Sequence, residues 1–308
     1  MQTAISKMTL TSAAMPWTRS AWSLLFPPEG QRTASSRSPV RIGLALGGGF
    51  ARGIAHAGVL RVLEQYRIPI YCITGISAGA IVAAAYASGT PITQIVRAGC
   101  SMRFGDVGRF SLGRMGLVGS QAMNRFLQSL LKTCRFEQMR IPLGVVATDL
   151  SPGAPVSFAG TGEVLEPIRA SCAYPGLFQP VSHNGRLLVD GAMSMGVPAA
   201  LARQLGATHV ISVSLPPAPP SAAPQNMLQV VSRCFQILQS RFETSWRSES
   251  NLVIAPEIGG IEWNAFDRGR ELVRAGEVAT LSSIPIIREW LSFSVAPPSP
   301  FFQLEVAH

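Results

Sequence analysis

One pentapeptide places a serine in a setting that favours nucleophilic chemistry. Gly75-Ile76-Ser77-Ala78-Gly79 fits the pattern GxSxG and stands between an apolar run and a stretch of small residues. This is the context of a nucleophile elbow, in which a sharp strand-to-helix turn exposes the serine Oγ and flanking glycines relieve the crowding. We therefore predict that Ser77 is a nucleophile and that Gly75 and Gly79 support the turn.

An acidic residue further along the chain could supply the base that a serine hydroxyl needs. Asp190 ends a short apolar run and is followed by Gly191 and Ala192. The glycine would free an aspartate at a strand end to reach across a sheet, although an Asp-Gly pair is also common in plain turns. Taken alone, the pair is more often such a turn, so Asp190 is at this point only a candidate base for Ser77, with Gly191 as its supporting residue.

The four histidines offer only a weak third member for a triad. In the usual α/β hydrolases the triad follows the order serine, acid, histidine, which leaves His209 and His308 as formal candidates. His209 precedes a predicted strand, and His308 is the last residue. His56 is expected to be packed in the first helix. A Ser–Asp dyad is the more economical interpretation, and a triad that uses His209 is its alternative.

A glycine-rich turn precedes the serine motif. Residues 47–53 read GGGFARG, between an apolar run and a segment with helical spacing. The free backbone N–H groups of such a turn bind a pyrophosphate or stabilise an oxyanion. The dinucleotide fingerprint GxGxxG fails, because Phe50 or Arg52 stands where it needs glycine, and no P-loop follows. An oxyanion loop and a plain tight turn are the interpretations left.

The composition indicates a folded chain with an arginine-rich positive charge. Of 308 residues, 47% are apolar and 14% charged, and the formal net charge is +9. This length supplies a core for one large domain or two small ones. All basic residues except Lys7 and Lys132 are arginines, which fits a phosphate-rich partner such as an anionic membrane or reflects only the base composition of the gene. No basic run with interleaved aromatics occurs, which argues against nucleic acid as a partner.

The cysteines and one uncharged stretch bear on location. The five cysteines are scattered without metal-ligand spacing, so we expect reduced thiols, no metal site and a cytoplasmic protein, with peripheral contact at a membrane. Residues 68–96 carry no charge and have the hydropathy of a membrane span. Gly75, Gly79, Gly89 and Pro91 interrupt them, so we expect a buried strand, a turn and a buried helix.

The chain divides into three expected parts. Residues 1–40 are rich in Ser, Thr and Ala with Glu29 as the only acid, and we expect a flexible N-terminal extension, with an organelle transit peptide as the alternative. Residues 41–292 form the main domain, and 293–308 a C-terminal tail. Within the main domain we expect residues 103–119 to form a mobile loop whose arginines and aromatics suit a phosphate head group and an acyl chain.

Strands and helices are expected to alternate through the main domain, which predicts a mainly parallel sheet covered on both faces. The expected strands are 41–46, 70–73, 142–150, 187–190, 208–213 and 252–254, and the expected helices are 54–66, 77–88, 121–132, 163–171, 197–205, 226–246 and 268–292.

In this order, the three motifs resemble the patatin-like phospholipase family and are most similar to its bacterial and esterase-like branch. They are GGGFARG at 47–53, GISAG at 75–79 and DGA at 190–192, and the resemblance covers roughly residues 41–290. It implies a three-layer α/β/α fold with a mainly parallel central sheet, in which residues 41–292 are the catalytic domain.

The resemblance also implies a function. The chain would be a serine acyl hydrolase that cleaves fatty-acyl esters of phospholipids, lysophospholipids or related lipids, without a metal or another cofactor. Ser77 would be the nucleophile and Asp190 its base. Three backbone N–H groups would hold the oxyanion, those of Gly48, Gly49 and Phe50.

One residue departs from the family pattern. Many members have glycine where this chain has Phe50, and a phenylalanine adopts a positive φ only at an energetic cost. Arg52 would stabilise the same loop. The departure leaves an alternative open, a catalytically weak or silent protein that binds lipid or regulates another protein.

Overall fold

The computed structural model describes residues 39–113, 115–119, 121–216 and 223–292. These residues belong to the compact unit that begins at Pro39. The expected extension, except for residues 39 and 40, and the expected tail lie outside the described residues.

Short apolar runs form the strands of a central sheet, as their composition predicts. The sheet has eight strands within the described ranges, of which β10, β9, β1, β2 and β5 run parallel, while β6, β7 and β8 add antiparallel pairs at one side. In spatial order they are β10 (Leu252–Ile254), β9 (His209–Val213), β1 (Ile42–Leu46), β2 (Cys72–Gly75), β5 (Leu143–Asp149), β8 (Arg186–Asp190) and β7 (Val181–His183), with β6 (Pro155–Ala159) also on β5.

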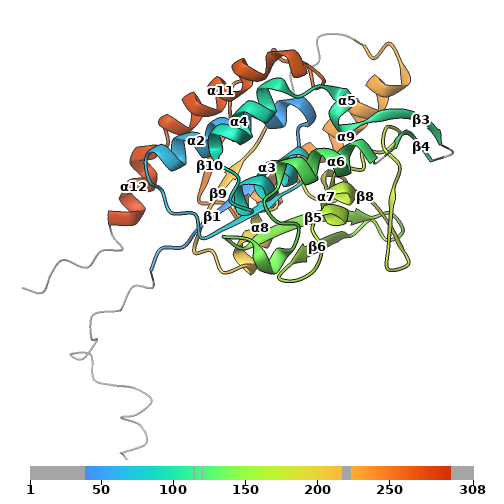
Figure 1. Ribbon diagram of the computed structural model, residues 1–308. Helices are drawn as coiled ribbons and strands as arrows, with labels where there is room; N and C mark the ends of the chain where they lie inside the picture. Colours follow the sequence, from blue (N-terminus) through green and yellow to red (C-terminus); the bar gives the residue numbers. More distant parts are fainter. Residues whose placement is uncertain (1–38, 114, 120, 217–222, 293–308) are drawn as a thin grey trace, which may run out of the picture. The chain divides into compact units, whose positions relative to one another are not determined.

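Helices cover both faces of this sheet (Figure 1). Leu44 and Leu46 of β1 pack with α2 and α3 on one face, where α4 lies against both helices and α11 lies against α2 and α4. Ala45, between the two leucines, faces the opposite side and packs with α8 and α10, because neighbouring side chains of a strand alternate. The expected three-layer α/β/α fold with a mainly parallel sheet is therefore confirmed. The helices are α2 (Ala55–Gln65), α3 (Ala78–Ala87), α4 (Ile92–Ser101), α5 (Phe104–Val107), α6 (Gln121–Leu130), α7 (Leu165–Ser171), α8 (Ala199–Gln204), α9 (Met227–Arg241), α10 (Glu243–Ser248), α11 (Gly269–Leu281) and α12 (Ile284–Ser292).

The uncharged stretch 68–96 contains a strand and a helix, as expected. The strand, however, starts at Cys72 and ends at Gly75, two residues later than the predicted strand 70–73. Tyr71 is 41% exposed and its N–H still donates a 2.7 Å hydrogen bond to the Ile42 carbonyl, but the paired register with β1 starts at Cys72, opposite Gly43. No helix in the described part of the chain has the length and hydropathy that a membrane span requires.

The region 103–119 is more ordered than the loop we predicted. It contains α5 and a two-stranded hairpin of β3 (Arg109–Gly113) and β4 (Gly116–Gly119). The Arg109 side chain and residue 114 lie outside the described residues, so the expected contact of these arginines with lipid stays a prediction. Residues 226–246 and 268–292 each form two helices instead of one, α9 with α10 and α11 with α12.

Candidate active site

Ser77 stands on a strained turn between β2 and α3. Its backbone has φ 54° and ψ −127°, a positive φ that costs about 1–3 kcal/mol for a residue other than glycine. A Cβ on Gly75 would lie 2.5 Å from the Gly79 carbonyl oxygen, and a Cβ on Gly79 would lie 2.4 Å from that of Leu46. Both glycines are therefore required by the close approach of the backbones, as the nucleophile elbow predicts.

Asp190 lies at the end of β8 and contacts the serine directly. The Ser77 hydroxyl donates a 2.8 Å hydrogen bond to Asp190 Oδ2, and the Ala192 N–H donates one of 2.9 Å to Oδ1. Antiparallel pairing with β5 sets Asp190 opposite Ala147. A Cβ on Gly191 would lie 2.2 Å from the Val146 carbonyl oxygen, so only glycine fits after the aspartate. The structure brings together the two residues that we predicted as a dyad.

Burial controls the protonation of Asp190. The residue is 1% exposed, and loss of solvation raises the pKa of its carboxyl to about 7, although the hydrogen bonds from Ala192 and Ser77 lower it. A carboxylate with a pKa near 7 is a stronger base than an ordinary aspartate and is still ionised in part at neutral pH. The site can thus remove a proton from Ser77 without a histidine.

Ser171 fixes the backbone of the nucleophile and was not predicted. Its Oγ accepts a 2.8 Å hydrogen bond from the Ser77 N–H and donates one of 2.6 Å to the Val146 carbonyl. The side chain is fully buried at the end of α7. The sequence signal is only a serine at the end of a short helix, because both of its partners come from distant strands.

The glycine-rich turn presents three free N–H groups next to Ser77. Its first residue is tied to β9 through Gly47 N–H and the Val213 carbonyl, at 3.0 Å. A Cβ on Gly48 would lie 3.4 Å from the Ser77 Cβ, which places the turn against the nucleophile. Among the described residues, none accepts a hydrogen bond from the N–H groups of Gly48, Gly49 or Phe50. Unpaired donors beside a nucleophile are the arrangement that an oxyanion requires.

The side chains of His56 and Arg52 anchor this turn through hydrogen bonds to backbone carbonyls. His56 Nε2 donates to the Gly47 carbonyl at 2.8 Å, and burial lowers the histidine pKa to about 4, so the ring is neutral. Arg52 is 9% exposed and donates from Nη1 to the Pro216 carbonyl at 3.2 Å. Burial lowers the arginine pKa, while the charge of Glu262 raises it. His56 thus bonds to the turn itself and Arg52 ties it to the segment after β9, and neither is hydrogen-bonded to the Ser77–Asp190 pair.

Phe50 adopts the backbone conformation that the sequence analysis treated as costly. Its φ is 54°, so this chain places a phenylalanine in the left-handed region. Four aromatic rings surround its side chain, with centroids 4.8–6.5 Å away. Such pairs contribute about 0.5–1.5 kcal/mol each, which offsets the backbone strain. The four rings are those of Phe104, Phe178, Trp263 and Phe266.

Among the described residues, no histidine lies beside the dyad, and His209 is at the wrong end of its strand; His308 lies outside the described residues. His209 begins β9 and pairs with Ile42 at the start of β1. Ser77 follows the end of β2, which runs parallel to β1. The two residues therefore lie at opposite ends of the parallel strands, and the His209 ring packs on Trp290 instead. The triad alternative lacks the geometry that it needs.

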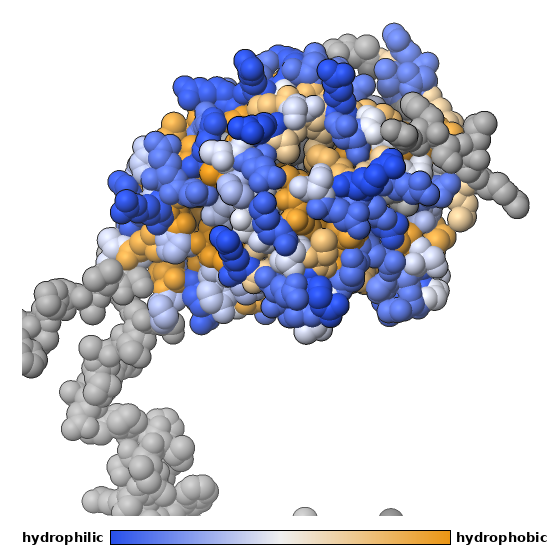
Figure 2. Space-filling view, viewed as in Figure 1, coloured by the Kyte–Doolittle hydropathy of each residue, from blue (hydrophilic) through white to orange (hydrophobic). Residues whose placement is uncertain are grey.

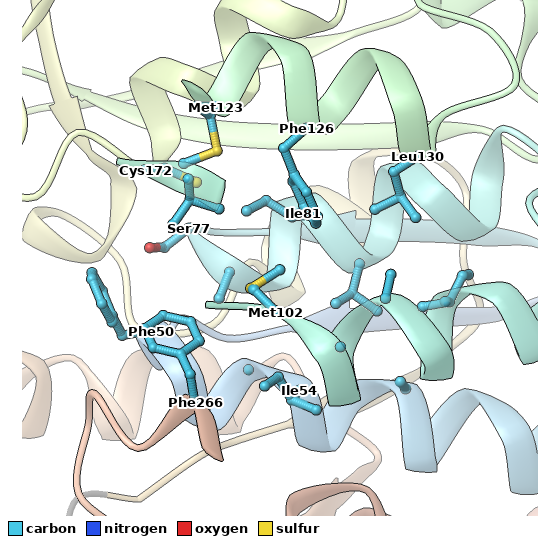
Figure 3. Close-up of a pocket in the computed structure, with 18 of the residues that line it drawn as sticks. Phe50, Ile54, Ser77, Ile81, Met102, Met123, Phe126, Leu130, Cys172 and Phe266 are labelled. Atoms are coloured by element: carbon cyan, nitrogen blue, oxygen red, sulfur yellow. The ribbon is translucent and has the colours of Figure 1, made fainter. Parts of the chain in front are cut away.

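Two pockets open on either side of Ser77. The first is an apolar cavity between α3, α4 and α6, with Ser77 and Phe50 at one end and Leu130 at the other (Figure 3). None of its lining residues is charged. The second is more polar and contains Asp190 and Arg52 together with residues of α9. Figure 2 shows that apolar residues surround a hollow near the centre of one face, among hydrophilic residues. Within the described residues, no cluster of three His, Cys, Asp or Glu side chains has the arrangement to hold a metal ion.

Curated proteins of the NTE family are similar to part of this chain. An uncharacterized NTE family protein of Mycobacterium tuberculosis is 35% identical over 191 residues, which are 61% of this chain and 52% of that protein. Lysophospholipase NTE1 of Cryptococcus neoformans var. neoformans is 32% identical over 190 residues, which are 57% of this chain and 11% of that protein. The chain spans about half the length of the mycobacterial relatives that it matches.

The fold and a family model agree with these relatives. The crystal structure of VipD from Legionella pneumophila superposes with a TM-score of 0.53 at 14% identity, covering 81% of this chain and 67% of that one. This likeness shows a shared fold. The model of the family described as patatin-like phospholipase matches residues 44–203, more than half of the chain and all three motifs. The chain therefore belongs to the patatin-like phospholipase family.

Proposed function

We propose that this protein is a serine acyl hydrolase that cleaves fatty-acyl esters of lysophospholipids, phospholipids or related lipids. The observation that carries the proposal is the 2.8 Å hydrogen bond from Ser77 Oγ to the buried Asp190 carboxylate. Three free N–H groups and an apolar cavity adjoin this pair. Membership of the family and similarity to a protein named lysophospholipase support the same reaction class.

The first half of the reaction forms an acyl-enzyme. Asp190 Oδ2 takes the proton from Ser77 Oγ, and the oxygen attacks the ester carbonyl carbon. The carbonyl oxygen becomes an oxyanion, which the N–H groups of Gly48, Gly49 and Phe50 stabilise. When the tetrahedral intermediate collapses, the ester C–O bond breaks and the proton on Asp190 passes to the departing alcohol or lysolipid. The acyl group is then bound to Ser77 as an ester.

The second half returns the enzyme to its starting state. Asp190 takes a proton from water, whose oxygen attacks the acyl carbon of the serine ester. The same N–H groups stabilise the second oxyanion, and its collapse releases the fatty acid and returns the proton to Ser77 Oγ. The water must reach Asp190 from the polar pocket, because that pocket contains the carboxylate and the apolar cavity does not.

A catalytically silent lipid-binding protein is the second candidate. Its supporting observation is the strained backbone of Phe50, at φ 54°, in the proposed oxyanion loop. The two candidates differ in hydrolysis of a short p-nitrophenyl ester and of a lysophospholipid in the presence of EDTA. We expect turnover by the wild type and loss of it in folded Ser77→Ala and Asp190→Asn. An inactive wild type, with no label on Ser77 from a fluorophosphonate, would favour the silent protein.

We also propose a peripheral contact with an anionic membrane through α9. Met227, Val230 and Ile237 lie three and seven residues apart on one face of this helix and are 68%, 49% and 52% exposed. Other residues of the helix, including Gln236, line the polar pocket, so the helix that carries this exposed apolar face also borders the site. We expect Ile237→Ser to reduce sedimentation with anionic vesicles, whereas Ser240→Ala, at an exposed polar position of the same helix, should not. Equal binding by both variants would remove this surface from the proposal.

A further inference from the structure

We propose that Phe50 sets the substrate selectivity of the site, because its ring separates the binding of the acyl chain from the binding of the alcohol. The ring restricts the alcohol side of the ester to compact groups without a second long chain. This inference rests on the proposed acyl hydrolase function. Its basis is that Phe50 and Ser77 are the two residues that line both pockets among the described residues.

The two pockets differ in chemistry, which assigns one side of the ester to each. The cavity that runs from Ser77 to Leu130 is lined by apolar side chains and by the Ser77 and Cys172 side chains. A hydrocarbon chain gains about 25 cal/mol for each Å² that it buries on such a surface. The second pocket presents Arg52, Gln236 and Gln239. The acyl chain therefore lies in the apolar cavity, and the alcohol occupies the polar pocket.

The Phe50 ring is held in place as a wall between them. Phe266 and Trp263 contact it edge-on at centroid distances of 5.7 and 4.8 Å, and Phe104 stacks on it at 6.2 Å. Phe266 lines the apolar cavity and Trp263 lines the polar pocket. A ring fixed from both sides does not swing away to let a chain pass, because protein interiors leave little free space around packed side chains.

This wall determines what happens to a second acyl chain. The second chain of a diacyl lipid cannot share the apolar cavity, because the ring blocks the path from the alcohol side. It would instead lie in the second pocket, where it would contact the polar groups of Arg52 and the glutamines of α9 as well as apolar side chains. These polar groups would lose water without gaining hydrogen bonds. With glycine at position 50, the two pockets would merge. The phenylalanine thus narrows the range of alcohols that the enzyme accepts.

The test compares two soluble esters with the same acyl group. These are 1-hexanoyl-lysophosphatidylcholine and dihexanoylphosphatidylcholine, both kept below the concentration at which they form micelles. For the wild type we expect a higher kcat/KM with the lysolipid. For Phe50→Gly, which keeps the backbone N–H and removes the ring, we expect the diacyl-to-monoacyl ratio of kcat/KM to rise by about tenfold or more. Phe158→Ala is the matched control, because the Phe158 ring packs on His183, is not among the rings around Phe50 and lines neither pocket; its ratio should equal that of the wild type.

The outcomes separate this inference from the function on which it rests. A wild type that hydrolyses neither ester and takes up no fluorophosphonate contradicts the proposed function. An active wild type whose ratio is unchanged in Phe50→Gly overturns the role of Phe50 alone. If Phe50→Gly loses activity on both esters, the ratio is measured in Phe50→Ala and Phe50→Leu. We expect the diacyl-to-monoacyl ratio to be higher in Phe50→Leu than in the wild type, and higher again in Phe50→Ala. A ratio equal to that of the wild type in both variants overturns the inference.

Discussion

In the proposed mechanism, a single buried carboxylate carries the acid–base chemistry of the site. Asp190 is held by two hydrogen bonds, to Ser77 and Ala192, and is otherwise removed from water. Loss of solvation outweighs these bonds, so the carboxyl keeps its proton to a higher pH than an exposed aspartate does. In the proposed mechanism, the Asp190 carboxylate, with a pKa of about 7, takes the role that the imidazole has in a triad.

The pKa of Asp190 predicts the pH dependence of the reaction. Only the ionised carboxylate accepts the proton of Ser77, so kcat/KM should fall as the pH is lowered through about 7. The rate should be flat at higher pH. The measurement is kcat/KM for a neutral short-chain ester from about pH 5 to about pH 9. A flat profile across this range would contradict the assignment of Asp190 as the base.

The free energy of unfolding should also depend on the ionisation of Asp190. The folded-state pKa of about 7 lies above the ordinary aspartate pKa of 3.8, so between these values the folded state binds more protons than the unfolded state. Stability contributed by this group is therefore lost as the pH rises through that window. Asp190→Asn removes the buried charge, and we expect its gain in free energy of unfolding to be larger at pH 8 than at pH 5. Urea denaturation measures it, and a gain independent of pH would place the titration elsewhere.

Ser171 is predicted to position the nucleophile without touching the substrate. In Ser171→Ala, the Ser77 N–H and the Val146 carbonyl lose their partner, at a cost of about 1–3 kcal/mol for a buried unpaired group. The elbow then relaxes, so we expect kcat to fall by about tenfold or more with little change in KM. Ser88→Ala is the control, since Ser88 is also buried and bonds to the Ala85 carbonyl.

The Ser88→Ala control shows whether the loss of kcat comes from misplacing Ser77 or only from removing a buried serine. Ser88→Ala should lose stability to a similar degree and keep its kcat. If both variants lose kcat to the same extent, Ser171 has only a structural role.

At the scale of elements, the crossing of α2 and α11 fixes the helix that supports the glycine-rich turn. A Cβ on Gly58 would lie 2.0 Å from the Val273 carbonyl oxygen, and a Cβ on Gly276 would lie 2.1 Å from that of Ala55. The two helices therefore approach with their backbones almost in contact. His56 on α2 bonds to the Gly47 carbonyl, so this crossing also positions the turn.

Gly58→Ala should destabilise the protein, against the intrinsic preference of helices. Alanine in a helix interior is favoured over glycine by about 1 kcal/mol, but here the added methyl group pushes the helices apart. We expect a fall in the free energy of unfolding of about 2 kcal/mol or more. Gly105→Ala is the control, because the Cβ at Gly105 in α5 would have no heavy atom within 4 Å. Urea denaturation of both variants is the measurement, and equal stabilities would contradict the close crossing.

The elements that the sequence predicted well are those with continuous apolar runs. The strands β1, β5 and β9 are buried along all or nearly all of their length, and their runs of hydrophobic residues predicted them. The sequence pattern did not predict β6, β7 or α4. No residue of β6 is buried, and α4 follows Pro91 with only two buried residues, Ile92 and Ile95.

The site could be predicted where its residues carry a motif. Ser77, Asp190 and the glycines stand in short patterns whose geometry is local, and the structure places them as these patterns require. Ser171 and the wall at Phe50 depend on contacts between residues distant in sequence. A positive φ at a phenylalanine could not be read from the sequence, because the four rings that compensate it come from separate segments.

At the scale of the whole molecule, the apolar cavity predicts a preference for acyl-chain length. It extends from Ser77 past Ile81 towards Leu130 (Figure 3). Ile81→Phe should block it near the serine, and Leu130→Phe should shorten only its far end. We therefore expect Ile81→Phe to favour short chains strongly and Leu130→Phe to reduce only the rate with the longest chains, in kcat/KM for p-nitrophenyl esters of increasing length. Identical profiles for the two variants would contradict this placement of the acyl chain.

The central claim is that Ser77 becomes acylated when Asp190 accepts its proton. The most direct measurement is the intact mass of the protein after reaction with a fluorophosphonate, followed by mapping of the modified peptide. We predict one adduct on Ser77 in the wild type, none in Ser77→Ala and a reaction slowed by at least about a hundredfold in folded Asp190→Asn. An adduct on another residue, or an equal rate in Asp190→Asn, would contradict the account.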